Sequence, residues 1–319
     1  MMMHPILNVG VDVAKDAVVV ACAARSFPVK RVPNQRAPLR AWLKSLPAGS
    51  RIGLESTGAS HEVLADLAQA QGYPVFLLNP LETRHDAKAM GTRAKTDRVD
   101  AELIARLIAQ EHTRVRADTP PTVNQRTLDR LIRRRAKIVG LKGTLKLTMR
   151  HLGGFAAALK AVVGKLDALL AKIEATMAAI AACSPQHQEA QQRVETIVGV
   201  GPLVGIGLTN TLERVPFRKA DAFVAFIGFD PRANDSGHKA GRRRLSTRGP
   251  AELRRLLLNA AMSAINTTVW KPIDEHDRTQ GWSTTASLVI IARTIARAAW
   301  SIHHDRTTVN PERITKCLT

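Results

Sequence analysis

Short β-branched runs alternate with turn signals and helical patterns through the first 110 residues, and this alternation most constrains the fold. We expect strands at 6–13, 18–23, 29–32, 51–55 and 75–78. The first two read as a hairpin, and a helix over 62–71 separates the last two. Strands that pair first and then alternate with helices predict a mixed α/β sheet with helices on its faces.

Four acidic residues fall at the ends of these elements. Asp12 lies near the end of the first strand, and Glu55 ends the fourth. Asp97 and Asp100 share one face in the first turn of a helix that Thr96 can cap, although acids there also have an ordinary explanation in the helix dipole. Carboxylates gathered at one sheet edge repel unless a cation neutralises them, and oxygen ligands select Mg²⁺ or Mn²⁺. The set therefore predicts a metal site suited to phosphodiester chemistry.

The charge balance points to a polyanion partner. The 319 residues carry 47 Lys+Arg against 27 Asp+Glu, a formal charge of +20. Such an excess favours nucleic acid over a merely solvated basic surface. Aromatic residues make up 4%, too few for a base-stacking platform. No membrane span or signal peptide is expected, and three scattered cysteines argue against disulfides or zinc. We expect a cytoplasmic protein that makes no membrane contact.

A helical middle follows, with apolar residues at every seventh position. These are Leu131, Ile138, Leu145, Leu152, Leu159, Leu166, Ile173 and Ile180. A second apolar position three residues on completes a coiled-coil-like seam at Leu141, Phe155, Val162 and Leu169. Gly153 and Gly154 interrupt the pattern, which predicts two long helices that fold back or pair between subunits. The second helix, rich in Ala and Leu, has the composition of an oligomer contact.

The first of these helices is strongly basic. Nine basic residues and one acid lie between Arg126 and Arg150. We expect contacts with a nucleic-acid backbone from Arg130, Arg133, Arg134 and Lys137. A solvated basic face is the plainer alternative.

Two features of the C-terminal part point to DNA. The segment V-G-V-G-P at 198–202 resembles half of a helix-hairpin-helix, in which the backbone around Gly199 and Gly201 would meet a phosphate; a plain helix connection is the alternative. Ser236 precedes a glycine in an arginine-rich loop, where a positive field would hold a phosphate beside an accessible hydroxyl. The basic residues expected there are Lys239, Arg242, Arg243, Arg244 and Arg248. Ser246 is a rival nucleophile, but its surroundings favour a helix cap.

These segments together resemble a known family. The motifs are G-V-D-V-A-K at 10–15, L-E-S-T-G at 54–58, A-K-T-D-R-V-D-A at 94–101, V-G-V-G-P at 198–202, G-F-D-P-R at 228–232, S-G at 236–237 and L-S-T-R-G-P-A-E-L-R-R-L-L at 245–257. The chain resembles transposases of the IS110 family, RNA-guided recombinases of bacterial insertion sequences. The resemblance spans nearly the whole chain, with weaker agreement at 59–61, after the S-T-G, and beyond residue 270.

The resemblance implies a division of labour between two chemical groups. Asp12, Glu55, Asp97 and Asp100 match a metal-binding set in a RuvC-like domain of the RNase H fold. Ser236 matches the nucleophile that becomes joined to DNA. Family members form dimers that assemble into tetramers, with carboxylates and serine contributed by different subunits. They hold a structured non-coding bridge RNA that pairs with donor and target DNA, and they act in the bacterial cytoplasm, at the nucleoid.

We therefore expect a RuvC-like domain at 1–115, a coiled-coil helical domain at 116–187 and a mostly helical transposase domain at 188–319. The actin-like kinase and Hsp70 group also begins with a V-G-V-D-type hairpin, but the chain lacks its Gly-rich phosphate turns. Two alternatives to a serine recombinase remain open. One is a hydrolytic RuvC-like nuclease that uses the carboxylates alone, and the other is a nucleic-acid-binding protein without catalysis.

Overall fold

The computed structural model describes residues 6–24, 27–55, 60–78, 96–113, 115–232 and 244–309, together with Pro80, Thr83 and Asp86. The chain divides into two compact units, Met1–Pro120 and Pro121–Thr319. Each unit is described by itself. The predicted division into three domains stays a prediction.

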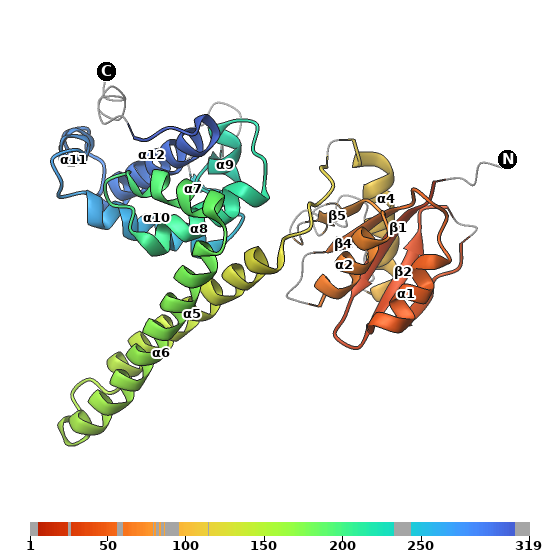
Figure 1. Cartoon of the computed structure of the whole chain (residues 1–319), viewed down its shortest axis with the longest axis horizontal. Helices are drawn as coiled ribbons and strands as arrows, with labels where there is room; N and C mark the ends of the chain where they lie inside the picture. Colours follow the sequence, from red (N-terminus) through yellow and green to blue (C-terminus); the bar gives the residue numbers. More distant parts are fainter. Residues whose placement is uncertain are drawn as a thin grey trace, which may run out of the picture. The chain divides into compact units, whose positions relative to one another are not determined.

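Unit 1 is built on a five-stranded mixed sheet (Figure 1). Its strands are β1 Asn8–Val13, β2 Ala17–Cys22, β3 Lys30–Pro33, β4 Arg51–Glu55 and β5 Val75–Leu78, in the order β3-β2-β1-β4-β5. The first three strands form an antiparallel meander, whereas β4 and β5 run parallel to β1. The mixed α/β sheet predicted from the sequence is confirmed, and the fourth and fifth strands have the predicted bounds.

Helices cover both faces of this sheet. On one face, Val9 and Val11 share a hydrophobic core with Leu39 and Leu43 of α1 (Arg36–Lys44) and with residues of α2 (Glu62–Ala70). Side chains alternate along a strand, so Gly10 faces the other side. That side is covered by α4 (Asp97–Glu111), which contacts β1, β2 and β4.

The backbone of β1 lies directly against α4. A Cβ atom added to Gly10 would stand 2.1 Å from the carbonyl oxygen of Ala101 and 2.2 Å from the amide nitrogen of Ala105. On the neighbouring strand, a Cβ at Gly53 would meet the side chains of Ile104 and Ile108. Two glycines in adjacent strands thus form a shallow seat for the helix, because any side chain would hold it away.

Unit 2 begins with a helical hairpin made of α5 (Val123–Thr148), η1 (Gly153–Phe155) and α6 (Ala156–Ala182). The predicted break at the two glycines is confirmed, and α6 folds back along α5 (Figure 1).

The predicted seam of the hairpin is half right. The first heptad set is at least half-buried at every position except Leu152, which is exposed. The second predicted set does not lie in the seam between α5 and α6, because its members are exposed by between 45% and 66%. Val163, Leu170 and Met177, one residue further on, take that place in α6. In α6 the buried partner of each seam residue is therefore the one four positions later, not three. The heptad spacing alone does not predict which of these two neighbours is buried.

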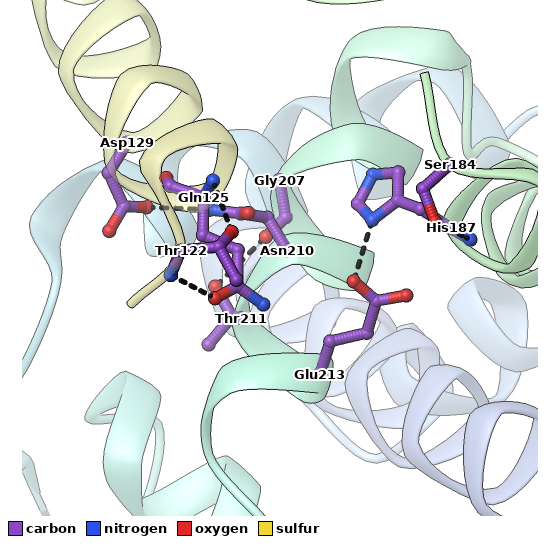
Figure 2. Close-up of polar contacts among 9 residues, drawn as sticks. All are labelled: Thr122, Gln125, Asp129, Ser184, His187, Gly207, Asn210, Thr211 and Glu213. Carbon is purple, nitrogen blue, oxygen red and sulfur yellow. Dashed lines mark hydrogen bonds and ion pairs between the residues drawn. The ribbon is translucent and has the colours of Figure 1, made fainter. Parts of the chain in front are cut away.

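The base of α5 is fastened to the C-terminal helices. Asn210 of α8 (Pro202–Arg214) is 1% exposed, and its side-chain amide donates to the Asp129 carboxylate at 3.0 Å and to the Gln125 carbonyl at 3.2 Å (Figure 2). Leu128 and Ile132 of α5 also enter the core of this unit. The helix that carries the basic residues is therefore fixed to the body of unit 2 by both polar and apolar contacts.

The rest of unit 2 is a helical bundle with one short strand pair. Its remaining elements are α7 Pro185–Glu195, α9 Ala220–Ile227, β6 Pro231–Arg232, β7 Arg244–Leu245, α10 Ala251–Ala264, α11 Lys271–Thr279 and α12 Thr284–Asp305. His187 of α7 bonds to Glu213 of α8 at 2.7 Å (Figure 2). In the described chain, α12 is long and apolar enough to cross a membrane, but its apolar face, including Ile295 and Ala299, lies in the core of this bundle.

Replacing Gly10 by alanine should destabilise unit 1. The added methyl group would meet backbone atoms of α4, which cannot move aside as a side chain can, so we expect a loss of about 3 kcal/mol. Chemical denaturation measures it. Gly140→Ala is the matched control, because Gly140 lies in α5 with open space around it and alanine should add about 0.5–1 kcal/mol there. Equal stability of Gly10→Ala and the parent chain would contradict the close packing.

Candidate functional site

The parallel pairing of β1 and β4 brings two of the predicted acids to one edge of the sheet. Val11 pairs with Leu54, so Asp12 and Glu55, each one residue further on, end up side by side at the carboxyl ends of their strands. Both side chains are partly exposed. This edge is where open α/β sheets place their ligands.

The first turn of α4 supplies the other two acids. Thr96 has extended backbone angles, and its hydroxyl accepts the Val99 amide at 3.3 Å, so it caps the helix as predicted. Asp97 and Asp100 follow in the first turn, where the helix dipole favours negative charge. Because α4 is seated on Gly10, two residues before Asp12, its first turn is held at the same edge of the sheet.

The pKa of Asp12 is affected by all three of the other carboxylates. The pKa of Asp12 is raised from 3.8 to about 6, and burial is the largest cause. Charges on neighbouring residues add to the rise, in the decreasing order Asp97, Asp100 and Glu55. The structure therefore brings the four sequence-predicted acids within electrostatic reach of one another, with Asp12 at the centre.

The donor set fits a hard divalent cation. Carboxylate oxygens are the ligands that Mg²⁺ and Mn²⁺ prefer, and a cation at this edge would offset the repulsion that raises the Asp12 pKa. In the described part of the chain, no three His, Cys, Asp or Glu side chains stand close enough together to hold a metal ion. Binding of a cation would therefore require these side chains to move closer together.

Sequence reasoning missed one residue at this edge. Thr83, between β5 and α4, is 6% exposed, and its Oγ1 lies 2.9 Å from Oε1 of Glu55. No spacing or motif in the sequence pairs a threonine with a glutamate 28 residues earlier. The contact follows from the parallel pairing of β4 with β5, in which Glu55 lies opposite Leu78.

Two groups stand out among the basic residues of α5. Arg135 and Lys142 form ion pairs with Glu174 and Asp167 of α6, at 2.6 and 2.5 Å. The four residues predicted to contact nucleic acid are Arg130, Arg133, Arg134 and Lys137, and all four are exposed. Their spacing of three and four residues places them on one face of the helix. That exposed face is defined here as the α5 basic stripe.

The V-G-V-G-P turn joins α7 to α8, and its two glycines differ. Gly199 has a φ of +98°, and a Cβ there would meet Ala264 and the Ala260 carbonyl of α10. Close packing against α10 and the positive φ therefore explain why a glycine occupies position 199. Gly201 precedes α8, is exposed and has open space around it. Of the two predicted phosphate contacts, Gly201 is the accessible one.

The predicted nucleophile Ser236 lies outside the described residues, as do Lys239, Arg242 and Arg243. The strands on either side are described: β6 pairs with β7, and Arg244 is exposed while Arg248 is half-buried.

Ser246, the rival nucleophile, is 9% exposed and donates its hydroxyl to the Asp230 carboxylate. It is not a helix cap, because α10 begins at Ala251 after Pro250. A buried hydroxyl in this position braces the strand pair and is a poor candidate for attack on DNA.

Comparison with known proteins identifies the chain. One family model, described as "Transposase", matches residues 9–152, and a second, described as "Transposase IS116/IS110/IS902 family", matches residues 191–276. The chain belongs to the IS110 family of transposases. The first match contains the four carboxylates, and the second contains Ser236 and the strands that flank it. Membership makes the chain a DNA-processing enzyme whose substrate is DNA.

Individual relatives agree with this assignment. The transposase for insertion sequence element IS1111A of Coxiella burnetii is 27% identical over 82% of this chain and 79% of its own length. A probable family 20 transposase of Pseudomonas aeruginosa is 24% identical over 95% of this chain and 98% of its own length. The pilin gene-inverting protein of Moraxella bovis is 26% identical over 66% of this chain and 65% of its own length. The relatives thus include proteins named for transposition and for inversion of a pilin gene.

Asp12→Asn should stabilise the metal-free chain at neutral pH. The pKa of Asp12 is raised on folding. Its contribution to the free energy of unfolding is therefore fully present below pH 3.8 and is lost as pH rises through about 6. The full shift corresponds to roughly 3 kcal/mol, and exposure to solvent reduces the expected gain to about 1–2 kcal/mol. Melting temperatures should therefore diverge above pH 6 and converge near pH 4. Identical pH profiles would contradict the clustering, and Asp16→Asn, at the exposed β1–β2 turn, is the control.

Proposed function

We propose that the chain is a serine recombinase of an insertion sequence, which cuts and rejoins DNA through a covalent link to Ser236. The observation that carries the proposal is the set of four carboxylates at one sheet edge, recorded in the raised pKa of Asp12. Family membership adds the expectation of DNA strand exchange. The strand order, with the central β1 flanked by an antiparallel and a parallel neighbour, supports a RuvC-like domain of the RNase H fold.

The chemistry needs no external energy source. The serine Oγ attacks a DNA phosphorus, and an Oγ–P bond forms as the bond from phosphorus to one deoxyribose oxygen breaks. The serine proton is lost, and the departing oxygen gains one. The ester conserves the bond energy, so attack by a strand-end hydroxyl on the phosphoserine rejoins DNA and restores the serine. When bound, Mg²⁺ or Mn²⁺ would hold the phosphate and offset the charge that develops on it.

The residues of this chain have separate tasks in that scheme. Asp12, Glu55, Asp97 and Asp100 would ligate the metal ion. Arg244 and Arg248, with Lys239, Arg242 and Arg243, would supply positive charge around the phosphate beside the serine. The proposal includes the family's sharing of one site between the carboxylates of one subunit and the serine of another.

Nucleic-acid binding extends over α5 as well. The α5 basic stripe exposes four cationic side chains on a helix fixed to unit 2, and Gly201 leaves the start of α8 open. Such surfaces bind phosphates without reading bases. We propose that a structured guide RNA pairs with donor and target DNA while the protein grips the backbones. The net charge of +20 and the 4% aromatic content support this division.

A covalent adduct is the decisive test of the chemistry. The chain is expressed with its flanking DNA in cells carrying donor and target, the cells are lysed in SDS, and DNA-linked protein is mapped by mass spectrometry. We expect an adduct on Ser236 that disappears in Ser236→Ala and in Asp97→Asn. Ser301→Ala, which removes a partly exposed hydroxyl on α12 that donates to Asp305, should keep the adduct.

Two results would replace the proposal with its alternatives. Cleaved DNA without an adduct, undiminished in Ser236→Ala, would indicate a hydrolytic RuvC-like nuclease. DNA and RNA binding with no cleavage in any variant would indicate a non-enzymatic binding protein.

A dimer that assembles into a tetramer is part of the proposal, and the hairpin offers a surface for it. Leu141 of α5, Phe155 of η1, and Val162 and Leu169, seven residues apart on α6, are exposed apolar side chains, named here the apolar stripe. Exposed apolar side chains on long helices favour pairing with another helix. A second copy of the chain, carrying the same stripe, is the proposed occupant.

Val162→Asp combined with Leu169→Asp should dissociate the assembly. Each substitution places a charge where the contact would bury an apolar side chain, so light scattering should report a monomer while the melting temperature stays within a few degrees. Ala171→Asp, on an exposed position of the opposite face of α6, should leave the mass unchanged. A double variant that retains the mass of the wild type would exclude this stripe as the contact.

A further inference from the structure

Thr83 makes a specific contact with the carboxylate site from outside the acidic set. Its hydroxyl lies 2.9 Å from Oε1 of Glu55 and 3.1 Å from the carbonyl oxygen of Pro80. A hydroxyl has one proton and can donate to one of these acceptors at a time. The carboxylate is both nearer and charged, and charge-assisted hydrogen bonds are the stronger ones. The Thr83 hydroxyl therefore donates its hydrogen bond to the Glu55 carboxylate.

Glu55 is the member of the set that most needs an external tether. The other three acids are aspartates, whose short side chains are oriented by a strand or by the first turn of a helix. A glutamate has one more rotatable bond than an aspartate and loses more side-chain freedom when it is fixed. Thr83 is 6% exposed, so its own position is set by packing, and a hydroxyl held in this way can restrict rotation of the Glu55 carboxylate.

We propose that Thr83 is a positioning residue of the metal site: its hydroxyl holds Glu55 in the orientation that ligates a hard divalent cation. The inference rests on the proposed metal site and names a residue that acts on it without touching the metal or DNA. Partners that orient ligating side chains typically change metal affinity 10–100-fold when they are removed. A purely structural threonine, bonded to the Pro80 carbonyl, would have no such effect.

Thr83→Val and Thr83→Ser separate these roles. Valine has nearly the shape of threonine without the hydroxyl, whereas serine keeps the hydroxyl without the methyl group. Thr211→Val is the matched control, because Thr211 is also buried but its hydroxyl bonds to a backbone carbonyl, that of Gly207, at 2.9 Å (Figure 2). All variants are made in the full chain.

The primary measurement is Mn²⁺ binding to the DNA-free protein by titration calorimetry. We expect Thr83→Val to bind Mn²⁺ about 10–100-fold more weakly than the parent chain, and Thr83→Ser and Thr211→Val to bind it as the parent does. As a second readout, the Mg²⁺ concentration that gives half-maximal Ser236–DNA adduct should rise in Thr83→Val, while saturating Mg²⁺ restores the full yield.

Each other outcome overturns a defined part of the argument. Mn²⁺ affinity unchanged in Thr83→Val, with a parent chain that binds Mn²⁺ and loses it in Asp97→Asn, refutes the role of Thr83 and leaves the metal site standing. A parent chain that binds no Mn²⁺ refutes the metal site and this inference together. If Thr83→Val fails to fold in metal-free buffer, Thr83→Ala is measured in its place, and the same outcomes apply.

Discussion

The close approach of α4 to the backbone of β1 is the constraint on which the candidate site depends. Gly10 removes the side chain that would separate the helix from the sheet, and Ala101 and Ala105 present small residues in return. With a larger residue at position 10, the first turn of α4 would stand further from the sheet edge. Asp97 and Asp100 would then lie away from Asp12, and the four carboxylates would lose their common location.

This arrangement places unfavourable electrostatics in a well-packed unit. Burial of Asp12 and repulsion from the neighbouring carboxylates both raise its pKa, so the ionised site is costly to hold together. Buried contacts elsewhere must hold the charges together. The core formed by Val9, Val11 and the helices on the opposite face supplies them. A local conflict of this kind is expected at functional sites, where the geometry serves chemistry at the expense of stability.

Unit 2 uses one pair of helices for three purposes. The seam between α5 and α6 is held by apolar residues and by the ion pairs of Arg135 and Lys142. A second face of α5 carries the exposed basic stripe. Exposed apolar side chains lie on both helices as well, at Leu141 beside the basic stripe on α5 and at Val162 and Leu169 on α6. The Asn210 contacts and the Leu128 and Ile132 packing fix this hairpin to the bundle, so nucleic acid bound on α5 would be held in register with the C-terminal helices.

The sequence by itself determined the local elements and the chemical character of the site. β-branched runs, the Thr96 cap and the glycine break in the helical middle each act over a few residues, so they could be predicted directly. The four acids were also found from sequence, because strand ends and helix starts carry recognisable signals. Which face of a heptad pattern packs inside the hairpin was predicted only in part, since spacing leaves i+3 and i+4 neighbours equivalent.

Tertiary structure alone decided the contacts between distant residues. Thr83 reaches Glu55 because β4 pairs with β5. No local sequence signal in either segment predicts this contact. Gly199 resembled a phosphate-binding turn, but packing against α10 explains it. The ion pair of Arg135 with Glu174 likewise depends on how α6 packs against α5. Local signals fix conformation because they depend on neighbouring residues, whereas side-chain partners depend on how separate elements meet in space.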